Sequence, residues 1–146
     1  MSNWNHYIKN FEAYLKIEKS LSGNSVSAYL HDVQLLRNYL SIEKNDAKPD
    51  DLSLQDLEHF LAHLHDLGLA DRSQARIISG LKAFYKYLVT DDYIKEDPTA
   101  LIEGPKLGKK LPETLSFEEI EKLIGALDLS KNENIRNNAM LETLYS

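Results

Sequence analysis

Residues 72–89 read RSQARIISGLKAFYKYLV, and this stretch decides the expected fold of the chain. Its apolar side chains recur at spacings of three and four residues, which predicts one helix from about Ser73 to Thr90. The expected buried face holds Ile77, Ile78, Leu81, Phe84, Tyr85 and Leu88. At about 3.6 residues per turn, the opposite face holds Arg72, Arg76, Ser79, Lys82 and Lys86.

The polar face of this predicted helix carries basic residues, and the sequence has no acid between Arg72 and Val89. A solvated helix face usually mixes both charges, because opposite charges at i and i+4 attract each other. Acidic residues outnumber basic ones by 23 to 17 in the whole chain, so an acid-free row is unusual here. It favours binding to a polyanion such as DNA, with an ordinary solvated face as the alternative interpretation.

Three further helices are predicted before this one. The first runs from about Trp4 to Glu18, and the second begins near Ser25. The third starts at the N-cap candidate Ser53 and stops at Gly68. No strand-like alternation persists, so the expected fold class is all-α, a bundle of four to five helices. The side chains expected in its core from these three helices are Trp4, Ile8, Phe11, Leu15, Val26, Tyr29, Val33, Leu36, Leu40, Leu57, Phe60, Leu61 and Leu64.

The composition changes after residue 102. Residues 103–114 read EGPKLGKKLPET, and their two prolines and two glycines are typical of a linker. Ser116 and Glu119 then form a capping-box pattern that opens a new helix, and a last helical pattern covers Ile135 to Leu144. We therefore expect a first domain over residues 1–102, a linker over 103–114 and the truncated start of a second domain over 115–146.

Length and composition restrict the possible classes of protein. The chain has 146 residues, 42% of them hydrophobic, which is enough to bury a core. The absence of cysteine excludes disulfides and thiolate sites and favours the cytoplasm. No apolar run approaches the roughly 18 residues that span a bilayer, so no membrane partner is expected. The net charge of −6 opposes DNA binding, but basic charge is concentrated in residues 72–89 and 106–110.

The second predicted helix has a polar and mostly uncharged face. Ser27, His31, Gln34 and Asn38 share this face, and Arg37 lies at its flank. Such side chains can form hydrogen bonds with base edges or phosphates. A neutral solvated surface explains the same face equally well.

The sequence offers no constellation for catalysis or metal binding. His59 and His63 have the i, i+4 spacing of zinc ligands, but the HExxH motif and a third ligand are absent, so ordinary surface or core histidines are the preferred interpretation. We expect no catalytic residues, no metal site and no cofactor in these 146 residues.

Short motifs in order along nearly the whole chain resemble one known family. They are Leu21-Ser22-x-Asn24-Ser25-x-x-x-Tyr29-x-x-Asp32-Val33, Arg76-x-x-Ser79-x-Leu81-Lys82-Ala83-Phe84-Tyr85-x-Tyr87-Leu88, Asp97-Pro98, Pro105-Lys106, Leu111-Pro112 and Leu115-Ser116-x-x-Glu119. Each motif is weak alone, but the ordered set resembles the Xer branch of the tyrosine recombinases, or phage integrases. The resemblance implies a SAM-like core-binding domain, a basic linker and the first helices of a catalytic domain.

The resemblance also implies a function. Such proteins cut and rejoin duplex DNA at specific sites through a tyrosine nucleophile, and their protomers assemble into a synaptic tetramer. The first arginine of that catalytic centre usually follows a segment like Leu144-Tyr145, where this sequence stops, so these residues alone are expected to be inactive. Chromosome dimer resolution and mobile-element integration both remain open. Matched by position, and with the basic linker added, the residues expected at the DNA are Ser25, Ser27, His31, Arg72, Ser73, Arg76, Ser79, Lys82, Lys86, Lys106, Lys109 and Lys110.

Two other classes of function remain as alternatives. A helical adaptor would bind a protein partner without using the basic row of residues 72–86, because fold does not determine function. A regulator would bind DNA through a helix-turn-helix and never cut it. The linker followed by a new capped helix argues against a finished regulator.

Overall fold

The computed structural model describes residues 3–43, 47–109 and 111–145, and these residues form six α-helices, one short 3-10 helix and no strand. The chain divides into two compact units, Met1–Leu107 and Gly108–Ser146, each with its own internal packing. The expected all-α class is confirmed. The first unit contains α1 (Trp4–Ile17), α2 (Gly23–Glu43), η1 (Pro49–Asp51), α3 (Leu54–Asp66) and α4 (Asp71–Thr90), and the second contains α5 (Phe117–Gly125) and α6 (Asn132–Tyr145).

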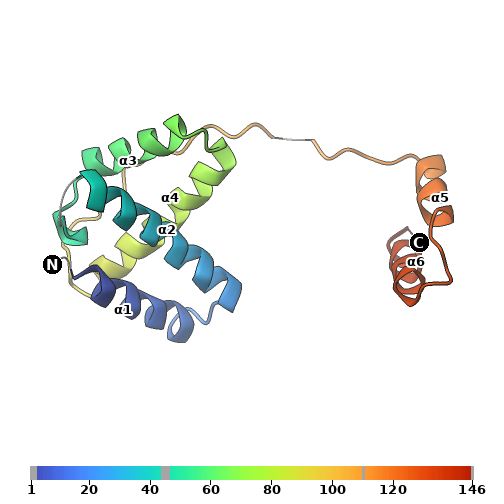
Figure 1. Ribbon diagram of the computed structural model, residues 1–146, viewed down its shortest axis with the longest axis horizontal. Helices are drawn as coiled ribbons and strands as arrows, with labels where there is room; N and C mark the ends of the chain where they lie inside the picture. The colour runs from blue at the N-terminus through green and yellow to red at the C-terminus, as the bar shows by residue number, and fades with distance from the viewer. Residues whose placement is uncertain (1–2, 44–46, 110, 146) are drawn as a thin grey trace. The chain divides into compact units, whose positions relative to one another are not determined.

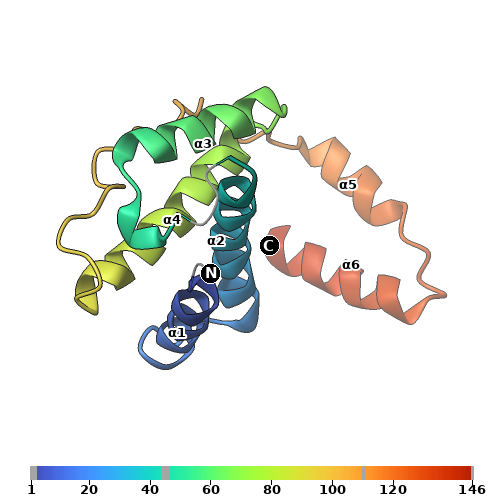
Figure 2. The ribbon, with the colours of Figure 1, turned by 60° about the vertical axis from the view of Figure 1, so that its left-hand side comes forward.

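Helix α4 is the centre of the first unit, and it packs against α1, α2 and α3. Figures 1 and 2 show α2 crossing α4, with α1 and α3 beside them. The apolar face predicted for α4 is the core of the bundle, because all six of its predicted side chains are buried. Trp4 from α1 stacks on Phe84 with ring centroids 6.2 Å apart. Burial of this one face therefore organises the other three helices around α4.

Local sequence signals explain where the helices begin and end. The Ser53 side chain accepts a hydrogen bond from the Asp56 N–H at 3.3 Å, and the Asp56 side chain accepts from the Ser53 N–H at 2.9 Å, so the N-cap of α3 is a capping box. Gly68 follows α3 with φ +84°, a left-handed conformation that glycine adopts without strain. The predicted start and stop of α3 are both confirmed.

Two helices begin two residues earlier than the sequence suggests. Helix α2 begins at Gly23 because Ser22 precedes it and accepts a hydrogen bond from the Ser25 N–H at 3.3 Å. Helix α4 begins at Asp71, whose carboxylate suits the positive end of a helix dipole. Among the core residues predicted from the first three helices, Ile8, Tyr29 and Leu61 are only half-buried, because they lie at the edges of their apolar faces.

Buried polar atoms join the connecting segments to the helices. The Trp4 indole N–H donates to the Ala47 carbonyl at 2.8 Å, and the Tyr85 hydroxyl donates to the Pro49 carbonyl at 3.1 Å. After α4, Thr99 and Ile102 are buried, and the Lys82 ammonium donates to the Ile102 carbonyl at 3.3 Å. The chain therefore stays attached to the bundle as far as Ile102.

The second unit consists of α5 and α6. Ser116 and Glu119 form the predicted capping box at the start of α5. The Phe117 and Tyr145 rings lie 5.7 Å apart, yet none of the side chains described between residues 111 and 145 is buried. Across both units, the described helices are either too short or too polar to cross a lipid bilayer.

Candidate nucleic-acid interface

The polar face predicted for α4 lies on the surface of the bundle. Each of its basic residues is exposed, as are the two serines beside them, because the opposite face of α4 fills the core. These exposed residues are Arg72, Ser73, Arg76, Ser79, Lys82 and Lys86. They form one row along the helix, and we call it the basic row.

One acid from another helix enters this row. Asp32 of α2 is completely buried, and its Oδ1 accepts a hydrogen bond from Nη2 of Arg76. The same Nη2 donates to the Ala28 carbonyl at 3.3 Å. The Arg76 side chain as a whole nevertheless remains 48% exposed to solvent. In the fold, one carboxylate beneath Arg76 therefore offsets part of the positive charge of the basic row.

Burial changes the chemistry of the Asp32 carboxyl group. Removal from water raises its pKa from 3.8 to about 6, although Arg76 and, to a smaller extent, His31 oppose this rise. Its second oxygen, Oδ2, has no hydrogen-bond partner among the residues that the structure describes. A buried acceptor without a partner is costly. This carboxylate therefore makes one strong interaction, with Arg76, at the cost of one unsatisfied atom.

The raised pKa predicts how stability depends on pH. Between about pH 4 and pH 6, Asp32 stays protonated in the folded chain but loses its proton in the unfolded chain. Because of this difference, the free energy of unfolding falls as the pH rises from about 4 to about 6. The fall is at most about 1.4 kcal/mol per pH unit for one proton. Urea unfolding measures this effect when the parent chain and Asp32→Asn are compared at several pH values. Between pH 4 and pH 6, the free energy of unfolding of the variant should rise relative to that of the parent. If the difference in free energy of unfolding between the two proteins is the same at every pH, the raised pKa of Asp32 is contradicted.

Gly80 makes this arrangement possible. It lies one turn after Arg76 on α4 and is buried against α2. A Cβ built on Gly80 would lie 2.7 Å from the Asp32 Cγ and 2.9 Å from the Asp32 Cβ. Real Cβ atoms do not approach other carbons so closely, so a side chain here would displace the Asp32 carboxyl group.

The candidate residues of α2 lie at the same crossing. Arg76 contacts Ala28 and Asp32, and the charge of His31 acts on the Asp32 carboxyl group, so His31 lies near the basic row. Ser27 and His31 are exposed, whereas Ser25 is half-buried and accepts a hydrogen bond from the Ser22 hydroxyl at 3.1 Å. On the α2 side of the candidate interface, Ser27 and His31 are therefore the exposed side chains.

The other polar residues predicted on α2 have neighbours of their own. The Gln34 side chain donates to Asn38 Oδ1 at 3.0 Å, and Arg37 donates to Asn5 Oδ1 at 2.8 Å. The polar face of α2 is thus partly occupied by internal hydrogen bonds.

The predicted linker lysines are only partly described. Lys106 and Lys109 are exposed. Lys106 belongs to the first compact unit and Lys109 to the second. Lys110 lies outside the described residues.

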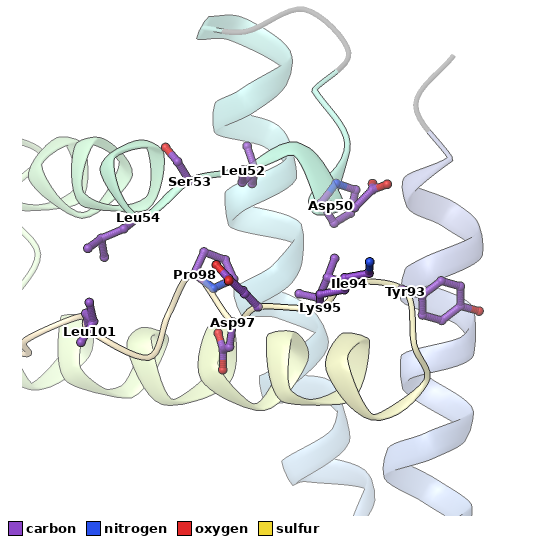
Figure 3. Close-up of a pocket in the computed structure, with 12 residues that line it drawn as sticks. Asp50, Leu52, Ser53, Leu54, Tyr93, Ile94, Lys95, Asp97, Pro98 and Leu101 are labelled. Atoms are coloured by element: carbon purple, nitrogen blue, oxygen red, sulfur yellow. The ribbon is translucent and has the colours of Figure 1, made fainter.

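A groove on the first unit has the opposite charge character. It lies between η1, the start of α3 and residues 93–101 (Figure 3). Asp50, Glu96 and Asp97 line it beside apolar residues such as Leu54 and Leu101. Carboxylates repel phosphates, so this groove is unsuited to the DNA backbone.

The histidines singled out by spacing have other neighbours. His63 packs against Tyr39 with ring centroids 5.0 Å apart, and His59 is exposed and lines a small hollow with Tyr39 and Leu40. No group of three metal-ligating side chains is found in residues 3–43, 47–109 and 111–145.

Comparison with known proteins agrees with the resemblance seen in the sequence. Tyrosine recombinase XerD of Staphylococcus epidermidis is 37% identical over 142 residues, and XerD of Listeria innocua is 36% identical over 142 residues. Each of these alignments covers 97% of this chain and 48% of the relative. The chain thus spans about half the length of the curated relatives that it matches.

A solved structure and a domain family match as well. An integrase from mycobacterium phage Brujita superposes with a TM-score of 0.62 over 83% of this chain and 39% of that protein, at 16% identity, which shows a shared fold. Residues 8–91 match the family described as phage integrase, N-terminal SAM-like domain. This range covers α2, η1, α3 and the whole of α4, together with most of α1. With this match over more than half of its length, the chain belongs to the phage integrase N-terminal SAM-like domain family.

Proposed function

We propose that this chain is the DNA-binding portion of a site-specific tyrosine recombinase that cuts and rejoins duplex DNA. The observation that supports this proposal most is the basic row of α4, which is exposed along its whole length in a chain of net charge −6. The similarity to XerD recombinases over 97% of the chain supports the same conclusion. Lys and Arg side chains in a row bind phosphates by releasing condensed counterions.

In this proposal, the basic row lies along the phosphate backbone and His31 of α2 lies beside it. Lysines 106, 109 and 110 extend the contact beyond the bundle. The division into residues 1–102, a linker over 103–114 and the start of a catalytic domain over 115–146 is part of the same proposal. The partners are double-stranded DNA and other recombinase protomers, and the protein acts in the cytoplasm.

Lys86→Glu tests this function. We expect the variant to bind duplex DNA more weakly than the parent at every sequence, because it replaces a phosphate contact with a repulsion. In a salt titration followed by fluorescence anisotropy, the log–log slope should become flatter by about one unit. Lys95→Glu makes the same charge change in the acidic groove and should alter the slope much less.

The alternative function is a helical adaptor that does not use the basic row. If the parent binds duplex DNA and Lys86→Glu matches it across the titration, phosphates do not contact this row. If the parent shows no DNA binding at low salt, the adaptor becomes the better interpretation.

A further inference from the structure

We propose that Asp32 is a positioning residue for DNA binding, which holds the Arg76 guanidinium group in a fixed orientation on the basic row. This inference rests on the proposed function and adds a residue that itself makes no contact with DNA. Asp32 is completely buried beneath the row, and among the residues that the structure describes its side chain accepts a hydrogen bond from Arg76 alone.

The geometry divides the Arg76 guanidinium group into two parts. Nη2 is directed into the fold, toward Asp32 Oδ1 and the Ala28 carbonyl. A guanidinium group has five N–H donors in one rigid plane, so fixing one nitrogen fixes the direction of the others. The side chain as a whole remains 48% exposed, and in this proposal its remaining donors face a phosphate. An arginine that is not held in place rotates freely before binding. It loses this conformational freedom when it binds DNA, and the loss weakens binding.

Electrostatics alone would give Asp32 the opposite role. A carboxylate beneath a phosphate-binding surface repels DNA, so removing its charge should strengthen binding. Removing a positioning group should weaken binding despite the gain of one positive unit of charge. The two roles therefore predict opposite signs for one substitution, and this makes the inference testable.

The test is Asp32→Asn in the same salt titration of a fluorescent duplex. We expect binding to weaken roughly three- to tenfold, which is the scale of the conformational cost of ordering one side chain on binding. The matched control is Asp71→Asn, which removes the same charge from an exposed position at the start of α4 and should bind DNA slightly more tightly. Tighter binding by Asp32→Asn, as in the control, would overturn the inference.

Stability provides a readout that separates positioning from a general defect in folding. Asp32→Asn should be at least as stable as the parent at pH 7, because it removes a buried charge, and yet bind DNA more weakly.

The Arg76 Nε–H resonance of this variant should also broaden or shift toward that of a free arginine, because the guanidinium group starts to rotate. An unchanged resonance would count against positioning.

Arg76→Lys keeps the test decisive even if Asp32→Asn fails to fold. Lysine retains the charge and the attraction to Asp32, but it lacks the rigid fork that can face a carboxylate and a phosphate together. We expect this variant to bind DNA more weakly than the parent by a similar factor. Binding equal to the parent would overturn the inference, whereas failure of the parent itself to bind DNA would overturn the proposed function instead.

Discussion

Gly80→Ala is expected to destabilise the first unit by about 2–4 kcal/mol, the scale of overpacking together with damage to a buried ion pair. The usual effect in a helix is the reverse, since alanine is favoured over glycine by about 1 kcal/mol. Here the new methyl group would lie 2.7 Å from the Asp32 Cγ. The Asp32 carboxyl group or the crossing of α2 and α4 must then shift, and urea unfolding at pH 7 measures the loss.

A second substitution and a matched glycine identify the cause. Asp32→Ala in the Gly80→Ala background removes the carboxyl group, which lies closest to the new methyl group, and leaves only the Cβ of residue 32 near it, so the double variant should be more stable than Gly80→Ala alone. Gly23→Ala is the control, because a Cβ on Gly23, at the start of α2, meets nothing within 4 Å. If Gly80→Ala were as stable as Gly23→Ala, the close approach of α2 and α4 would not exist in solution.

Arg76→Glu is expected to cost about 3–5 kcal/mol of folding free energy, because it leaves the buried Asp32 carboxylate without its cation and adds a second negative charge. The sequence alone suggests that this reversal leaves the fold intact, since Arg76 belongs to the polar face of α4. The structure corrects that expectation through the contact with Asp32. Unfolding by urea without DNA measures the effect.

Lys86→Glu is the matched control, because it makes the same change of charge on the same helix. Lys86 is exposed, so the substitution should change stability by no more than about 0.5 kcal/mol. The deficit of Arg76→Glu should also shrink as the pH falls toward 4, because protonation removes the charges that repel each other. Equal stability of the two variants at pH 7, or a deficit independent of pH, would show that the Asp32–Arg76 pair contributes little.

Much of the first unit follows from periodicity and capping. The six apolar residues predicted on α4 are buried, and Ser53, Gly68 and Ser116 have the roles that their residue types suggest. These features are local, because each depends on residues a few positions apart. The exposure of the basic row follows from the same helical period, whereas its contact with DNA stays a prediction.

The contact between Asp32 and Arg76 could not be predicted from local patterns, because the two residues are 44 positions apart in the sequence. Only the crossing of α2 and α4 brings the two side chains together. Two signals in the sequence nevertheless indicate it. Asp32 lies four residues before Leu36, on the apolar side of α2, where an acid needs a cation. Gly80 stands in the middle of α4, where glycine is unfavourable unless another group packs closely.

The close packing of Asp32 on Gly80 also restricts how this helix crossing can evolve. A change at Gly80 creates a clash, and a change at Arg76 leaves a buried charge without a partner. Loss of the Asp32 carboxyl group leaves no buried charge without a partner and removes the closest contact at Gly80, although the Cβ of residue 32 stays 2.9 Å from a Cβ on Gly80. Mutational paths between lineages should therefore pass first through position 32, and substitutions at positions 76 and 80 should accumulate only afterwards.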